Sequence, residues 1–121
     1  MEEIRNLKQY NLEERTFFFA KNVALYVKKL TKNISNIEYG KQVVRASGSV
    51  GANYIEANEA LSKKDFIMRI KISRKEAKES AYWLKLIVET NDEKYKQEGM
   101  ILHNEAIELK KILSSILVKS E

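Results

Sequence analysis

The chain has 121 residues, of which 44% are hydrophobic and 32% charged, a balance typical of one soluble globular domain. It contains no cysteine, which excludes disulfides, thiolate metal ligands and cysteine nucleophiles. The formal net charge is +5, and the absence of proline favours long helices joined by tight turns. We therefore expect a single all-α domain over residues 1–121.

The amino-terminal residues lack the basic and then apolar pattern of a secretory signal peptide. No apolar run approaches the ~20 residues needed to span a bilayer. We therefore expect a cytoplasmic protein without membrane contact. Residues 1–10 are expected to form a partial turn or a mobile arm.

Four helix-start signals divide the rest of the chain. A short polar residue followed three positions later by an acid is typical of a capping box, in which each side chain accepts a backbone N–H. Such pairs predict helices at about 12–33, 36–60, 63–90 and 92–118. The pairs are Asn11 with Glu14, Ser35 with Glu38, Ser62 with Asp65, and Thr90 with Glu93.

Apolar residues recur in each predicted helix at steps of three and four, which indicates one buried face per helix. The short connections favour antiparallel neighbours, and hence an up-down-up-down four-helix bundle. The predicted core residues are Leu12, Phe19, Val23, Val27, Leu30, Ile34, Val43, Val50, Tyr54, Ala57, Leu61, Phe66, Ile70, Ala77, Ala81, Leu84, Val88, Leu102, Ala106, Leu109, Leu113 and Ile116.

Two glycines, Gly48 and Gly51, lie inside the second predicted helix, where each costs roughly 1 kcal/mol relative to alanine. With Ser47 and Ala52 they form a strip of small residues on which a neighbouring helix or subunit can pack closely. The alternative is backbone exposure to a phosphate ligand. That alternative lacks support, because the sequence contains no GxxxxGK[ST] motif.

The positive charge is concentrated in two of the predicted helices. Residues 63–85 hold eight basic and three acidic residues, and residues 12–32 hold five basic and two acidic residues. A clustered basic surface is typical of a nucleic-acid partner, and the alternative is a solvated face that keeps the protein soluble. The candidate nucleic-acid-binding residues are Lys63, Lys64, Arg69, Lys71, Arg74, Lys75 and Lys78 of the third helix, with Lys28 and Lys29 of the first.

A second set of polar residues lies on or beside the facing sides of the second and third predicted helices. Buried polar groups must be paired, so an ion pair from Arg45 to Glu76 or Glu79 is expected between these antiparallel helices. The set is interpreted as a structural network that fixes helix register, with a binding site as the alternative. It comprises Arg45, Asn53, Glu56, Glu76 and Glu79.

Catalytic and metal sites find little support. His103 is the only histidine, which removes catalytic triads and most acid–base schemes. Dinuclear metal sites in helical bundles use Glu-x-x-His pairs, and His103 has no glutamate at that distance. We therefore expect no catalytic residue, no metal and no cofactor.

Tyr82 and Trp83 adjoin each other, so one is expected to complete the core and the other to remain available for a subunit contact. Phe17, Phe18 and Leu25 also lie partly outside the buried stripe of their helix. This surplus of apolar surface indicates self-association.

Three segments resemble a bacterial family described as four-helix bundle proteins or ribosomal-RNA intervening-sequence proteins. They are QVVRASGSVGANYIEAN (42–58), SKKDFIMRIKISRKEAKESAYWL (62–84) and HNEAIELKKILSSIL (103–117). The resemblance covers roughly residues 12–118. The chain has Ala57 and Asn58 where many members have Glu-Gly, which is typical of a side branch.

The resemblance implies an antiparallel bundle that assembles into a ring, commonly a homopentamer, with no established catalytic residues. It also implies similarity to the accessory variability proteins of diversity-generating retroelements, which form basic pentameric barrels that bind nucleic acid and a reverse transcriptase. Some relatives are encoded within insertions in the large-subunit ribosomal RNA gene.

Three hypotheses for function follow. The first is a non-catalytic oligomeric bundle that binds RNA or DNA through its basic helices. The second is a scaffold or accessory subunit that binds a protein partner, with the basic charge incidental. The third is a metal-dependent enzyme.

Overall fold

The computed structural model describes residues 11–120, which are almost entirely helical. The long helices are α2 (Leu12–Lys29), α3 (Ile34–Asn58), α4 (Lys63–Glu89) and α5 (Lys96–Ser120), and a single 3-10 turn, η1 (Glu93–Tyr95), precedes α5. The prediction made for residues 1–10 lies outside the described residues.

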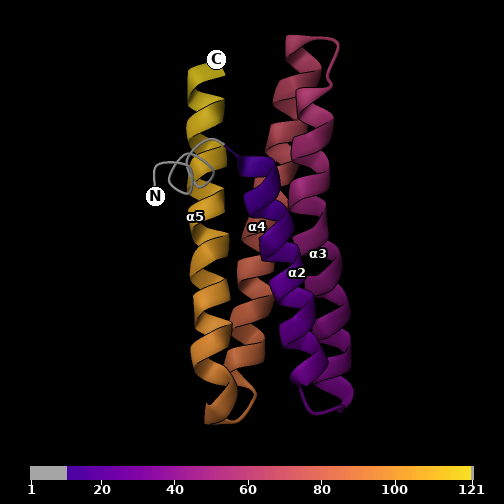
Figure 1. The fold of residues 1–121 in the computed structure, drawn as a ribbon, viewed down its shortest axis with the longest axis vertical. Coiled ribbons are helices and arrows are strands. Elements are labelled where there is room, and N and C mark those ends of the chain that lie inside the picture. Colours follow the sequence, from indigo (N-terminus) through magenta and orange to yellow (C-terminus); the bar gives the residue numbers. More distant parts are fainter. Residues whose placement is uncertain (1–10, 121) are drawn as a thin grey trace.

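The four long helices form an antiparallel bundle in which consecutive helices are neighbours (Figure 1). Close contacts join α2 to α3, α3 to α4 and α4 to α5, and α5 closes the bundle against α2. Because the order is cyclic, α2 and α4 are diagonal to each other, and in Figure 1 α4 lies behind α2. The predicted all-α, up-down-up-down architecture is confirmed.

Two of the four predicted helix starts are correct. Asn11 accepts the Glu14 N–H at 2.9 Å to begin α2, and Ser62 accepts the Asp65 N–H at 3.0 Å to begin α4. Acids in the first turn of α2 and lysines in its last turn further suit the helix dipole.

The other two predicted starts are wrong. The cap of α3 is Asn33, which accepts the Asn36 N–H at 2.9 Å, so the helix begins before Ser35. Thr90 ends α4 instead of starting the next helix, because its hydroxyl donates to the Leu86 carbonyl at 2.7 Å. Threonine makes this backward bond as readily as it caps a helix start.

The core runs along the bundle axis and contains most of the predicted apolar residues. Two predicted core residues are wrong: Ile34 is 84% exposed and Leu61 is fully exposed. Ile34 is the first residue of α3 and Leu61 lies in the connection between α3 and α4, where the chain turns away from the bundle axis. Tyr26, which the prediction missed, is fully buried.

Tyr26 connects α2 to the start of α5. Its hydroxyl donates to the Tyr95 carbonyl at 2.9 Å. Burial, reinforced by the nearby Glu98 carboxylate and by Tyr95, raises the pKa of Tyr26 to about 12, so the phenol is neutral at physiological pH.

Two asparagines hold the loops at this end of the bundle together. The Asn36 amide donates to Asn91 Oδ1 at 2.9 Å, and the Asn91 amide donates back to Asn36 Oδ1 at 2.8 Å. Each amide also donates to a backbone carbonyl, that of Thr31 or Ile87. The two side chains therefore satisfy each other's hydrogen-bonding groups and link the α2–α3 turn to the end of α4.

None of the described helices is both long enough and apolar enough to cross a membrane.

Candidate nucleic-acid interface

Helix α4 presents three chemically different faces. Its core face carries Ile70, Ser73, Ala77, Leu84 and Val88, all of which are buried. Its α3 side carries acidic and polar residues. Its solvent face repeats at alternating steps of four and three, so that these residues lie above one another along the helix. They are Lys64, Met68, Lys71, Lys75, Lys78, Tyr82, Lys85 and Glu89, and all are exposed.

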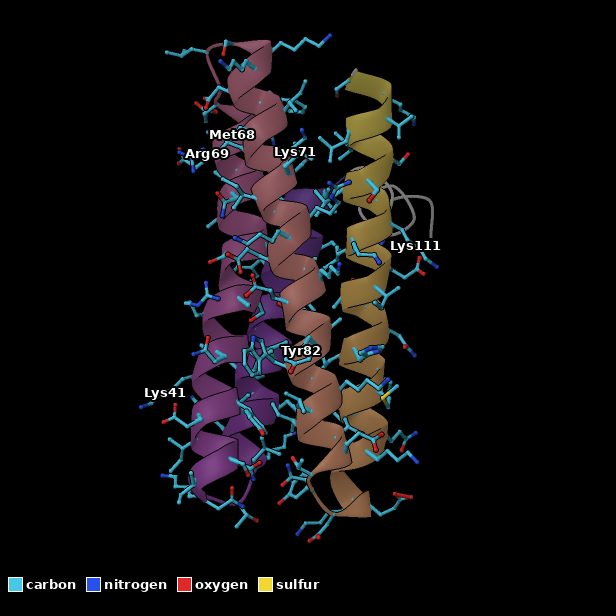
Figure 2. The ribbon with its side chains drawn as sticks, turned by 180° about the vertical axis from the view of Figure 1, so that it is seen from behind. Lys41, Met68, Arg69, Lys71, Tyr82 and Lys111 are labelled. Atoms are coloured by element: carbon cyan, nitrogen blue, oxygen red, sulfur yellow. The ribbon has the colours of Figure 1, made fainter. Side chains whose placement is uncertain are left out.

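Five of these residues form what we call the lysine row: Lys64, Lys71, Lys75, Lys78 and Lys85. At 1.5 Å rise per residue the row is about 32 Å long. No carboxylate of residues 11–120 forms a salt bridge with any of the five ammonium groups. The row is therefore a line of lysines on one helix that make no salt bridge within these residues. Figure 2 looks onto this side of the bundle, with Met68, Lys71 and Tyr82 labelled on α4.

Two of the four acids of α4, Glu76 and Glu79, are held on the α3 side of the helix. Arg45 of α3 contacts Glu76 through Nη1 at 3.5 Å and Glu79 through Nη2 at 3.4 Å. Glu76 is buried, and its Oε1 has no hydrogen-bond partner among the described residues. Arg45 thus holds both carboxylates at the α3–α4 seam, and this arrangement leaves the solvent face positive.

One further member of the predicted polar network, Asn53, makes contacts on the same seam. The Asn53 amide donates to the Ser49 carbonyl at 2.9 Å, and its oxygen accepts from Arg69 Nη1 at 3.2 Å. Arg69 is thereby directed toward α3, beside the lysine row instead of within it. Glu56 is exposed and makes no hydrogen bond to the described residues of this seam.

The remaining candidates of α4 flank the row. Lys63 is exposed at the first residue of the helix, next to Lys64. Arg74 is half-buried and lies about a quarter-turn away from Lys75 around the helix. Of the seven basic candidates on α4, four lie in the row, and Lys85 adds a fifth lysine that the candidate set omitted. Its spacing of seven residues from Lys78 is the signal that identifies it.

The two candidates of α2 do not join this surface. Lys28 and Lys29 belong to the helix diagonal to α4, so the bundle separates them from the lysine row. The Lys29 ammonium also contacts both oxygens of Glu98 at 2.9 Å. Lys28 instead lines a groove between α2 and α3, together with Lys32 and Lys41. The basic helices therefore present two separate positive regions.

An exposed aromatic ring interrupts the lysine row. Tyr82 is 61% exposed between Lys78 and Lys85, and its ring packs edge-on against Trp83 at a centroid distance of 5.1 Å. Trp83 is half-buried and lies 5.8 Å from the Tyr39 ring of α3. The expected division is confirmed, since Trp83 packs against the core and Tyr82 remains outside.

A shallow groove of about 610 Å³ extends along the amino-terminal half of α4. Apolar side chains of Ile67, Met68 and Ile72 line it, and Lys64, Lys71 and Lys75 are at its rim. The solvent face of α4 therefore combines cationic groups with apolar surface at both ends of the row.

The small-residue strip of α3 divides between two environments. Gly51 lies against α2, where an added Cβ would be 2.8 Å from Thr16 Oγ1, so this glycine permits close helix packing. Gly48 faces outward, with no atom within 4 Å of an added Cβ. Ile37, Val44 and Ile55 are exposed on the same outer side of α3.

The Arg15–Glu105 ion pair lies in another groove, which is lined by residues of α2 and α5. Arg15 binds Glu105 in a bidentate arrangement at 2.7 and 2.9 Å, and this hydrogen bonding raises the pKa of Arg15 above its ordinary value.

The described part of the chain contains no group of three or more His, Cys, Asp or Glu side chains that could hold a metal ion. His103 is half-exposed beside Asn104.

These features define a helical-bundle protein whose most distinctive surface is a line of lysines without salt bridges to the other described residues. Residues 8–115 match the 23S rRNA-intervening sequence protein family, and the chain belongs to that family.

One solved structure is similar over nearly its whole length. It is a protein of unknown function from the S23 ribosomal protein family of Bacteroides thetaiotaomicron, 32% identical in sequence with a TM-score of 0.72. The match covers 87% of this chain and 96% of that one. No curated protein matches the chain.

Proposed function

We propose that the protein is a non-catalytic, nucleic-acid-associated bundle that binds phosphates through the lysine row of α4. The observation that carries this proposal is the absence of acidic partners from the row within residues 11–120. Lysines engaged by acids of their own molecule are already neutralised, whereas free ammonium groups gain by releasing counterions from nucleic acid. The name of the family, which refers to an intervening sequence of 23S ribosomal RNA, is consistent with such a partner.

Nucleic-acid binding is expected to be strongly salt-dependent. If the five ammonium groups each neutralise one phosphate of a single strand, the logarithm of the association constant should fall with log[salt] at a slope of about −3.5. Fluorescence anisotropy of labelled RNA and DNA oligonucleotides, single-stranded and duplex, at rising salt measures this slope. Absence of binding to all four at the lowest salt would refute the proposal.

We also propose that copies of the chain assemble through the outer side of α3, in the ring of five that the resemblance implies. Ile37, Val44 and Ile55 are exposed there, and Gly48 keeps the surface between them flat. The groove of about 740 Å³ between α2 and α3 adjoins this side and is also lined by Ile37 and Val44. Contiguous apolar surface of this kind is typical of a protein–protein contact.

A charge placed in this apolar surface should dissociate the assembly. We expect Val44→Glu to reduce the mass measured by sedimentation velocity to that of one chain, because a buried unpaired carboxylate is costly. Ile101→Glu is the matched control, since Ile101 is exposed on α5 and lies away from α3. A wild-type protein that sediments as a monomer at all concentrations would exclude this assembly.

A further inference from the structure

The lysine row explains attraction to any polyanion, but the apolar groups within it require a more specific partner. Lysines alone contact phosphates equally well on duplex and single-stranded nucleic acid. Tyr82, Met68 and the apolar groove add nothing to such a contact. Their exposure on the same face as the lysines therefore indicates a ligand that offers apolar surface together with phosphates.

We propose that the solvent face of α4 binds single-stranded nucleic acid in preference to duplex, with the Tyr82 ring stacking on an unpaired base. This inference rests on the proposed function and specifies its ligand. A single strand presents unstacked bases beside its phosphates, and base stacking on exposed aromatic side chains is the usual means of sequence-tolerant single-strand binding. In a duplex the base faces are already stacked on one another and out of reach.

The geometry of Tyr82 suits this role. Its ring is 61% exposed, and Lys78 and Lys85 flank it along the helix at distances of roughly 6 and 4.5 Å in rise. Edge-on packing against Trp83, which itself contacts Tyr39 of α3, restricts the ring without covering it. A base stacked on Tyr82 would therefore have ammonium groups on both sides to receive its neighbouring phosphates.

The other end of the row offers a second apolar contact. The groove lined by Ile67, Met68 and Ile72 lies about 15–23 Å from Tyr82 along the helix axis, with Lys75 and Lys78 between Ile72 and Tyr82. An extended strand can follow this straight line, whereas the backbone of a duplex curves away from it.

Lysine–phosphate and stacking contacts do not read the 2′-hydroxyl, so RNA and DNA of one sequence should bind with affinities within about threefold of each other.

The test compares four probes of one mixed sequence by fluorescence anisotropy: single-stranded RNA, single-stranded DNA and the two corresponding duplexes. Inorganic polyphosphate serves as a competitor that has charge but no bases. We expect single strands to bind about tenfold or more tightly than duplexes. We further expect Tyr82→Ala to lower single-strand affinity about tenfold and to leave duplex affinity unchanged, while Tyr82→Phe retains the stacking ring and the affinity.

Phe17→Ala is the matched control, because Phe17 is comparably exposed, at 63%, on the diagonal helix α2. It should leave both affinities unchanged, and circular dichroism should show that every variant remains helical. Equal binding of single strands, duplexes and polyphosphate, unaffected by Tyr82→Ala, would overturn this inference while leaving the proposed function standing. Failure to bind any of the probes at low salt would overturn both.

Discussion

The triple variant Lys71→Glu, Lys75→Glu, Lys78→Glu should lose about 100-fold in affinity for a nucleic-acid oligonucleotide at low salt. These three residues are the centre of the lysine row, and each reversal replaces an attraction to phosphate with a repulsion. The slope of log K against log[salt] should also become shallower by about two, because three phosphate contacts are lost. Fluorescence anisotropy across a salt series gives both quantities.

The fold should survive these substitutions. All three side chains are exposed and form no salt bridge with residues 11–120, and exposed substitutions of this kind change stability by roughly 0.5 kcal/mol or less. Lys71 and Lys75 already repel each other at a spacing of four residues, so two glutamates there exchange one like-charge pair for another. Urea unfolding of the variant checks this point.

A second triple variant separates the position of the charge from its amount. Lys28→Glu, Lys32→Glu, Lys41→Glu alters the other basic region, at the α2–α3 groove. Both variants change the formal net charge from +5 to about −1. We expect the second to lose only the few-fold affinity due to net charge. Equal losses in the two variants would show that net charge, not the lysine row, determines binding, and would also restore Lys28 as a candidate.

The architecture could be predicted because the apolar repeat and the short connections are both local properties of the chain. The exact helix ends could not. Asn33 and Ser35 are both short polar residues that can cap a helix, and only the path of the turn decides between them. Likewise, Thr90 could open or close a helix, and packing at the end of α4 makes it a closing residue.

The candidate site was predicted in composition but only partly in position. The count of basic residues in α4 was correct, yet their division between the solvent face and the two seams depends on where the axis of each neighbour lies. Arg69 is directed toward Asn53 of α3 for this reason, and Arg74 is half-buried outside the row.

The prediction that Lys28 and Lys29 share one binding surface with the basic residues of α4 conflicts with the predicted topology itself. In an up-down-up-down bundle the first and third helices are diagonal, and this separates their outer faces. The pairing of Arg45 with both Glu76 and Glu79 holds these two carboxylates at the α3–α4 seam. That arrangement requires the register of two helices, which the sequence pattern alone does not specify.

Gly99→Ala should destabilise the bundle by about 2–3 kcal/mol, although alanine is the better helix former. An added Cβ at this position of α5 would overlap Tyr26 Oη and Val88 Cγ2. The Tyr26 ring cannot withdraw freely, because it is fully buried and its hydroxyl donates to the Tyr95 carbonyl. Overpacking therefore outweighs the gain in helix propensity. Urea unfolding monitored by circular dichroism measures the loss as a lower midpoint.

Gly48→Ala is the matched control within the same bundle and should have the opposite sign. Its added methyl group meets no atom within 4 Å, so the variant should gain about 0.5–1 kcal/mol from helix propensity alone. A monomeric preparation, or one dissociated by Val44→Glu, keeps any subunit contact at Gly48 out of this comparison.

A double-mutant cycle with Tyr26→Phe identifies the cause of the Gly99→Ala loss. Removing Oη takes away one of the overlapping atoms, and by itself costs about 1 kcal/mol for the hydrogen bond to Tyr95. The double variant should then be more stable than the sum of the two single losses predicts, by about 1–2 kcal/mol, since removing Oη relieves part of the overlap that the alanine creates. Strict additivity, or a Gly99→Ala variant as stable as wild type, would mean that α5 can shift away from α2 and that this seam is not closely packed.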